Sequence, residues 1–187
     1  VFVFGDINID LLIPGVSSLP PAGEEWEVPR MRTEPGGGAL LFALGLAKLG
    51  MKPVFLGSVG EDIYGDYLKS SMEKAGVDLS LLETRPGART GISISFTDDK
   101  DRCFLTYRGG CRVPDIGEVS LEQVSCARHI HLTGYAEAQN HDAYLAFLQR
   151  LRRETDVTVS FDVGWDSSGE WSRRIYELFP YQDVLLM

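Results

Sequence analysis

The chain has 187 residues, of which 44% are hydrophobic and 24% charged, a composition typical of a globular domain and not of a disordered, collagenous or coiled-coil protein. The 18 basic and 27 acidic residues give a net charge of −9, so we expect no nucleic-acid partner. The longest apolar stretch, residues 39–47, is far shorter than the roughly 20 residues of a membrane span, so we expect no membrane partner either. Three cysteines without a C-x-x-C pair favour a reducing, cytoplasmic location.

Short apolar runs alternate with helical patterns along most of the chain. In chain order, we predict a buried strand at 1–4, a loop at 14–23, an irregular or edge strand at 25–32, a helix from the glycines at 36–38 to Gly50, a strand at 53–59, a helix at 63–76, a short strand at 81–84, a strand at 128–132, a helix at 141–153, a strand at 157–162, a helix at 170–178 and a strand at 184–187. Buried strands that alternate with amphipathic helices predict an α/β domain with a mostly parallel sheet.

Residues 90–107 follow a different pattern. Ile92, Ile94 and Phe96 alternate with small polar residues, a polar turn follows at 98–101, and the pattern then returns. This alternation predicts a β-hairpin with one solvent-facing side. We expect the hairpin to lie outside the main sheet and to pair with residues 25–33, not with 1–5 or 54–59.

Polar residues follow the first predicted strand directly, in the sequence Gly5-Asp6-Ile7-Asn8-Ile9-Asp10. The carboxyl ends of parallel strands are where such sheets bind ligands, and Asn8 and Asp10 together can donate and accept hydrogen bonds to sugar hydroxyls. A turn in which both side chains bond their own backbone explains the same residues equally well. Asp162, at the end of a later strand, has the same two interpretations.

Glycines mark two further strand–helix junctions. Gly36, Gly37 and Gly38 precede an apolar helix, where a ligand could approach the backbone and use the free N–H groups of the helix start; close helix–sheet packing is the alternative. In the stretch from Gly60 to Gly65, we interpret Asp62 as a helix cap. His129 and His131 fall on one strand face, but the sequence shows no third metal ligand, so we interpret them as structural or surface residues and predict no metal site.

The order of these features resembles the ribokinase-like sugar kinases of the phosphofructokinase-B (PfkB) family. The resemblance covers the whole chain and depends on the strand with G-x-x-N-x-D, the glycines at 36–38, the Leu49-Gly50 pair, the Gly60–Gly65 motif and the hairpin. It implies an incomplete ribokinase-like α/β domain over residues 1–187, with a small β-sheet lid formed by segments of about 11–35 and 88–109. It also implies ATP-dependent phosphorylation of a hydroxyl on a sugar or a related small molecule.

The resemblance also implies particular site residues. Asp10 matches the acid that holds substrate hydroxyls, and Asn8 is its neighbour. Gly36 and Gly37 match a di-glycine that contacts the substrate through its backbone. Asp162 lies near the region of phosphate transfer, and Tyr107 and Arg108 lie at the end of the lid hairpin, where some members contact substrate.

Two departures from the family pattern qualify these expectations. Leu41 occupies the position of the usual Asn in the first signature and cannot bond a hydroxyl. The family's metal-associated motif and its catalytic segment would follow Met187, so we expect the nucleotide-binding part, the catalytic residues and the ligands of ATP and Mg²⁺ to lie outside this chain. A non-catalytic sugar- or nucleoside-binding module is the alternative. The resemblance further suggests a homodimer formed through the lid, for which the apolar residues of 92–96 are suited.

Overall fold

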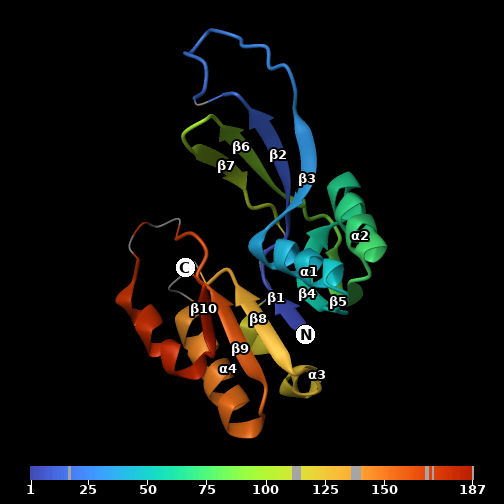
Figure 1. Ribbon diagram of the computed structural model, residues 1–187, viewed down its shortest axis with the longest axis vertical. Coiled ribbons are helices and arrows are strands. Elements are labelled where there is room, and N and C mark those ends of the chain that lie inside the picture. Colours follow the sequence, from blue (N-terminus) through green and yellow to red (C-terminus); the bar gives the residue numbers. More distant parts are fainter. Residues whose placement is uncertain (17, 111–114, 136–139, 167–168, 170, 187) are drawn as a thin grey trace.

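Six short strands form a parallel sheet at the centre of the structure (Figure 1). The computed structural model describes all residues except 17, 111–114, 136–139, 167–168, 170 and 187. The strands lie in the order β10 (Val184–Leu186), β9 (Thr158–Asp162), β8 (His129–Thr133), β1 (Phe2–Phe4), β4 (Val54–Gly60) and β5 (Asp78–Arg85), and all neighbours pair in parallel. The inner strands bury most of their side chains, polar ones included, because helices cover much of both faces of the sheet.

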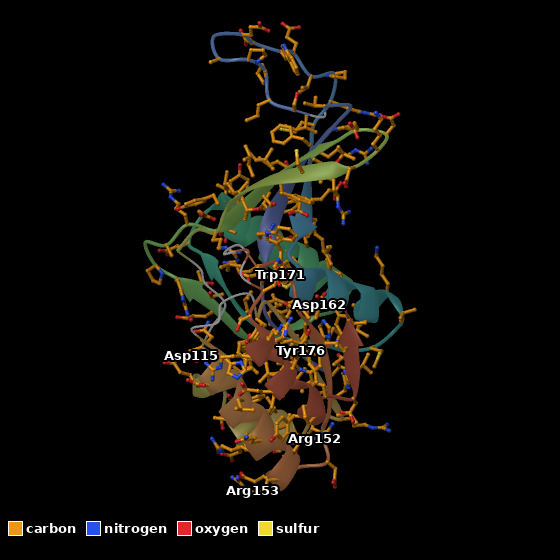
Figure 2. The ribbon with its side chains drawn as sticks, turned by 90° about the vertical axis from the view of Figure 1, so that its left-hand side faces the viewer. Asp115, Arg152, Arg153, Asp162, Trp171 and Tyr176 are labelled. Atoms are coloured by element: carbon orange, nitrogen blue, oxygen red, sulfur yellow. The ribbon has the colours of Figure 1, made fainter. Side chains whose placement is uncertain are left out.

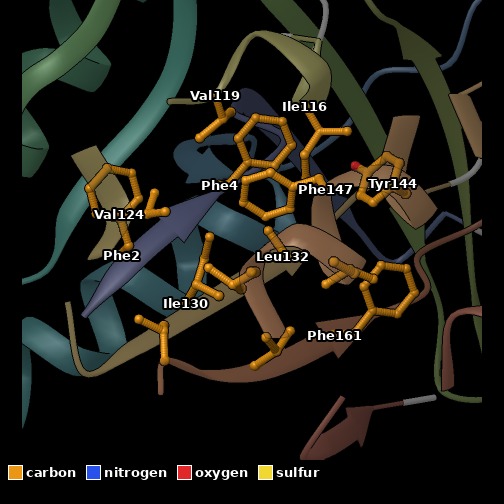
Figure 3. Packing of buried hydrophobic residues seen from close by; sticks show 14 of the residues in the cluster. Phe2, Phe4, Ile116, Val119, Val124, Ile130, Leu132, Tyr144, Phe147 and Phe161 are labelled. Atoms are coloured by element: carbon orange, nitrogen blue, oxygen red, sulfur yellow. The ribbon is translucent and has the colours of Figure 1, made fainter. Parts of the chain in front are cut away.

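Helices on the two faces enclose two separate cores. On one face lie α1 (Gly38–Lys48) and α2 (Ile63–Ala75); on the other lie α3 (Leu121–Ser125), α4 (His141–Glu154) and the 3₁₀ turn η1 (Ile116–Glu118). Figure 3 shows Phe4, Leu132 and Phe147 packed together in the second core. The helix α2 buries Leu68 and Met72, one turn apart on a single face, and ends at Gly76 in the left-handed conformation.

A second, smaller sheet of four strands stands at one end of the main sheet (Figure 1). We call this the small sheet; its order is β3 (Arg32–Gly36), β2 (Asn8–Pro14), β6 (Gly91–Thr97) and β7 (Arg102–Tyr107). The hairpin β6–β7 lies outside the main sheet, as predicted. Its predicted partner was wrong, however: β6 pairs in parallel with β2, and β3 pairs with the other edge of β2. Residues 25–31 form no strand.

In β6 the serines, which were predicted to face solvent, are more buried than the isoleucines that alternate with them, whereas all six residues of β7 are exposed. Ser93 and Ser95 are 8% and 2% exposed, whereas Ile92 and Ile94 are half-buried. The register explains the difference: Ser95 lies between Leu12 of β2 and Phe104 of β7 on one face. A small side chain such as that of Ser95 is shielded from solvent by bulky neighbours on the adjacent strands, even where no helix covers that face.

Two other predicted elements differ in kind or length. The helix predicted at 170–178 is replaced by 3₁₀ turns, η3 (Arg173–Glu177) and η4 (Phe179–Tyr181). Trp171 has a φ of +45°, outside the right-handed helical region, so an α-helix cannot run through it. The short strand predicted at 81–84 extends over the eight residues of β5. None of the described helices is long and apolar enough to cross a membrane.

His131 belongs to the packing of the main sheet. Its ring stacks on Phe42 of α1 with centroids 3.6 Å apart, and its Nδ1 lies 2.7 Å from Ser160 Oγ on β9. Ser160 Oγ also lies 2.7 Å from His129 Nε2. Burial lowers the pKa of His131 to about 4, so this imidazole is neutral at pH 7. These contacts support the structural interpretation of both histidines.

We predict that His131 makes the protein sensitive to acid. The pKa of His131 is lower in the folded protein than its usual value of 6.5, so between about pH 6.5 and 4 the unfolded chain binds more protons, and stability falls as the pH falls. We expect the free energy of unfolding to fall by about 2 kcal/mol over this range. This is less than the full pKa difference implies, because solvent reaches the neighbouring, half-buried His129. Urea unfolding of His131→Gln at a series of pH values should lack this component. An identical pH dependence in variant and wild type would contradict the assignment.

Candidate functional site

One face of the small sheet gathers the polar side chains that the sequence singled out. Strand pairing places Asp10 between Glu34 of β3 and Ser93 of β6, and Ser93 opposite Thr106 of β7. Asn8 lies on the same face, two residues earlier. We call Asn8, Asp10, Glu34, Ser93 and Thr106 the polar face of the small sheet.

Asp10 lies at the centre of this face and is held by its own strand. Asn8 Nδ2 donates a hydrogen bond of 2.7 Å to Asp10 Oδ1 and another of 3.1 Å to the Ile9 carbonyl. Partial burial raises the pKa of Asp10, and the nearby negative charge of Asp6 raises it further, while the bond from Asn8 lowers it. The result is a half-buried carboxylate with one oxygen bonded within the protein and with remaining acceptor capacity.

Gly36 and Gly37 allow the backbone to approach Asp10 and the end of β1. A β-carbon on Gly36 would overlap the carboxylate of Asp10. A β-carbon on Gly37 would lie 2.6 Å from the Asp6 carbonyl oxygen, and its φ of +95° is one that other residues rarely adopt. The structure therefore brings Asn8, Asp10, Gly36 and Gly37 together, as the sequence predicted. The expectation that the start of α1 offers free N–H groups was wrong for Gly38 and Ala39, because both donate to the carboxylate of Asp6.

Three members of the polar face were not found from the sequence. Ser93 Oγ and Thr106 Oγ1 lie 2.9 Å apart beside Asp10, and either hydroxyl can donate or accept. Glu34 flanks Asp10 on the opposite side. The alternation of 92–96 marked Ser93 as polar, but only the pairing of β2 with β6 reveals that it neighbours Asp10.

The two residues predicted at the end of the hairpin separate. Tyr107 pairs with Ile92 on the opposite face from Asp10 and lines a groove with Tyr64 and Arg89. Arg108 is exposed and directly follows β7, where its carbonyl oxygen would lie 3.2 Å from a β-carbon on Gly91. Continued alternation would place Arg108 on the side of Asn8 and Asp10.

Asp162 lies at the carboxyl end of β9 and bonds within its own turn. Its Oδ1 accepts a hydrogen bond of 3.0 Å from the Gly164 N–H, which agrees with the turn interpretation. In Figure 2, Asp162 and Trp171 lie toward the end of the main sheet that faces the small sheet, whereas Arg152 and Arg153 lie toward the far end. Asp162 therefore lies at the predicted edge of the sheet, but its described hydrogen bond is to Gly164 and not to Asp10.

Leu41, which replaces the family's usual Asn, is 52% exposed on α1. It lines a groove between β3, α1 and α2 together with Glu34, Lys48 and Lys74. An apolar side chain in this position supplies contact area near Glu34 but no hydrogen bond to a hydroxyl.

Asp62 is the N-terminal cap of α2, as predicted, and it also anchors the base of the small sheet. Its Oδ1 accepts a bond of 2.9 Å from the Gly65 N–H at the start of α2. Both the N–H and the hydroxyl of Thr90, just before β6, donate to Asp62 at 2.9 and 2.7 Å. Burial raises the pKa of Asp62, but these hydrogen bonds outweigh burial and lower it overall.

Removing this anchor should loosen the base of β6. Asp62→Ala leaves the donors of Gly65 and Thr90 without their acceptor, and we expect a loss of about 1–3 kcal/mol in the free energy of unfolding. Amide hydrogen exchange at Thr90 should accelerate. Asp78→Ala is the control, because Asp78 is exposed and its carboxylate bonds only Ser80, two residues away, among the described contacts. An equal loss in both variants, with unchanged exchange at Thr90, would contradict the anchoring role.

A bound metal ion or nucleotide phosphate usually requires particular groups from the protein. No cluster of three or more His, Cys, Asp or Glu side chains in the described part of the chain could hold a metal, and the sequence has no phosphate-binding loop with lysine. The described residues therefore do not form a complete ATP–Mg²⁺ site.

The fold and the polar face define a class of protein: an α/β domain with a separate small sheet, one face of which carries a row of polar side chains. Comparison with known proteins gives the family. The model of the pfkB family carbohydrate kinases matches residues 1–187. An ATP-dependent ribose-1-phosphate kinase of Halopiger xanaduensis is 32% identical over 162 residues, which are 86% of this chain and 52% of that protein. A protein of Arabidopsis thaliana named "probable fructokinase-6, chloroplastic" is 34% identical over 195 residues, 99% of this chain and 49% of that protein.

Solved structures agree on the fold. A PfkB protein from Polaromonas sp. JS666 superposes with a TM-score of 0.80 at 21% identity, covering 98% of this chain and 64% of that one. A ribokinase from Thermotoga maritima superposes with a TM-score of 0.73 at 22% identity, covering 98% and 57%. The chain belongs to the pfkB family of carbohydrate kinases. It spans about half the length of the curated relatives described above.

Proposed function

We propose that this chain is the substrate-binding part of an ATP-dependent kinase that phosphorylates a hydroxyl of a sugar or a related small molecule. The observation that carries the proposal is the half-buried carboxylate of Asp10, fixed by Asn8 and lying against Gly36. A carboxylate with remaining acceptor capacity can bind two neighbouring sugar hydroxyls. The hydroxyls of Ser93 and Thr106 and the backbone of Gly36 and Gly37 extend the same surface.

In this proposal the small sheet acts as a lid over the sugar. Its polar face is directed to the substrate, and Asp62 anchors its base at Thr90. ATP and Mg²⁺ would be held by residues of the full-length protein outside this chain, so the 187 residues alone would not transfer phosphate. Phosphoryl transfer depends on positioning and on electrostatic stabilisation of the transferred group, and Asp10 with the di-glycine supplies the first of these for the sugar.

The polar face admits several substrates. Arg108, exposed after β7, would suit a carboxylate or phosphate on the substrate. Relatives include proteins named as kinases of ribose 1-phosphate, fructose and 5-dehydro-2-deoxygluconate. We therefore propose a test panel of neutral hexoses and pentoses, sugar phosphates and acidic sugars, assayed for sugar-dependent ADP formation by the full-length protein.

One observation favours a second function, that of a sugar- or nucleoside-binding module without catalysis. Leu41 stands where the family has a hydrogen-bonding Asn, and it is half exposed in the groove beside Glu34. The same panel distinguishes the two: ADP formation with at least one sugar supports the kinase, whereas saturable binding without ADP formation supports the module.

We propose a cytoplasmic location and a homodimer through the face of the small sheet opposite Asp10, where Leu105 and Tyr107 are exposed. Light scattering of the full-length protein tests the dimer.

A further inference from the structure

Asp6 joins three elements at the point where the substrate site begins. It follows β1, and its Oδ2 accepts a hydrogen bond of 2.9 Å from the Gly38 N–H. Its Oδ1 accepts one of 3.3 Å from the Ala39 N–H and one of 2.6 Å from Thr133 Oγ1, at the end of β8. The Asp6 backbone carbonyl accepts a further bond of 3.4 Å from the Leu40 N–H. One residue thus links β1, the first turn of α1 and β8.

These bonds determine what the start of α1 can do. The N–H groups of Gly38, Ala39 and Leu40 point to Asp6, so they are not free for a ligand. The negative charge of Asp6 at the helix start is stabilised by the helix dipole. Gly37 packs directly against the backbone of Asp6, so the position of Asp6 fixes the backbone of the di-glycine, and with it the surface on which the Asp10 carboxylate rests.

We propose that Asp6 is a positioning residue for the sugar site: it holds the Gly36–Gly37 backbone beside Asp10. This inference rests on the proposed function. It assigns to Asp6 no contact with the sugar itself.

The charge of Asp6 acts on Asp10 in a definite direction. Asp10 is flanked by Glu34 on β3 and by Ser93 on β6, and Asp6 is the nearby carboxylate that raises its pKa, after the larger effect of burial. When Asp10 is protonated it loses acceptor capacity for hydroxyls, so sugar affinity falls as the pH falls. Removing the charge of Asp6 lowers the pKa of Asp10 and shifts this loss to lower pH.

The test is Asp6→Asn in the full-length protein. The asparagine keeps the size of the side chain but loses its charge. It also places an NH₂ group where the Gly38 N–H, the Ala39 N–H and the Thr133 hydroxyl need an acceptor. We expect the KM for sugar to rise about 10- to 100-fold at neutral pH through misplacement of the di-glycine, the KM for ATP to stay unchanged, and the acid limb of the sugar KM profile to move to lower pH. Titration of the Asp10 carboxyl carbon by NMR should show a lower pKa than in wild type.

Asp183→Asn is the matched control. Asp183 also accepts a backbone N–H bond, from Val159 of β9 at 2.7 Å, and pairs with Arg152 of α4 at 2.8 Å. It directly precedes β10, at the edge of the main sheet and away from the di-glycine. If Asp183→Asn raises the sugar KM as much as Asp6→Asn does, or if Asp6→Asn leaves the sugar KM as in wild type, the proposal is overturned.

A second variant covers failure of Asp6→Asn to fold. Thr133→Val removes only the hydroxyl that Asp6 binds, at a buried position that accepts the same shape. It should raise the sugar KM in the same direction and by a smaller factor; an unchanged KM in that variant would count against the proposal. If the wild-type protein phosphorylates no sugar, the proposed function fails, and the NMR titration alone decides whether Asp6 acts on Asp10.

Discussion

Replacing Asp10 with alanine in the full-length protein should raise the KM for sugar roughly 10- to 150-fold, because lost hydrogen bonds to a charged group cost about 1.5–3 kcal/mol. The KM for ATP and the melting temperature should change little, since Asp10 is half-buried and its described hydrogen bond is to Asn8. Steady-state kinetics with the preferred sugar of the panel provide the measurement.

An exposed carboxylate in the turn beside the small sheet provides the control for Asp10. Asp101 lies in the exposed turn between β6 and β7, where its Oδ1 accepts the Arg102 N–H at 2.8 Å. Asp101→Ala should leave the sugar KM within about twofold of wild type, as surface substitutions usually do. Wild-type sugar affinity in Asp10→Ala, or equal effects of the two substitutions, would remove Asp10 from the site.

Gly36→Ala should weaken sugar binding almost as much as Asp10→Ala does. The new methyl group would overlap the carboxylate of Asp10, and because that carboxylate is the end of a side chain, it can swing away while the fold survives. The hydroxyl acceptor is then displaced, and we expect the sugar KM to rise about 10- to 100-fold with a small change in stability. The ratio of the effect on KM to the effect on melting temperature is the measurement.

Gly45→Ala is the control for Gly36→Ala. Gly45 lies inside α1, and a β-carbon there meets nothing within 4 Å. Alanine in a helix interior should stabilise the protein by about 0.5–1 kcal/mol and leave the sugar KM unchanged. A larger rise in KM from Gly45→Ala than from Gly36→Ala would show that the di-glycine does not have the assigned role.

Sequence patterns predicted the main sheet well because its strands are governed by burial. The runs at 1–4 and 53–59 are apolar or small on both faces, and those at 128–132 and 157–162 keep one wholly apolar face; this pattern can be seen without knowing the strand register. The helix caps at Asp62 and Gly76 are local, and the structure confirms both.

The small sheet was harder to predict because pairing across the chain overrides local preference. Residues 8–14 contain Asn8, Asp10 and Pro14, which favour turns, yet they form β2 because β3 and β6 pair with both of its edges. Without β2, neither the register of β6 nor the position of Ser93 beside Asp10 can be deduced. Asn8, Asp10 and the di-glycine were found because they follow buried elements directly in sequence; Glu34 and Thr106 reach the site only through strand pairing.

The most direct test of the account is a crystal structure of the full-length protein with the sugar that it phosphorylates. We predict two sugar hydroxyls within about 2.6–3.2 Å of the Asp10 carboxylate oxygens, with the sugar lying against the backbone of Gly36 and Gly37 under the polar face of the small sheet. A sugar bound elsewhere, with Asp10 and the di-glycine out of contact with it, would contradict the account.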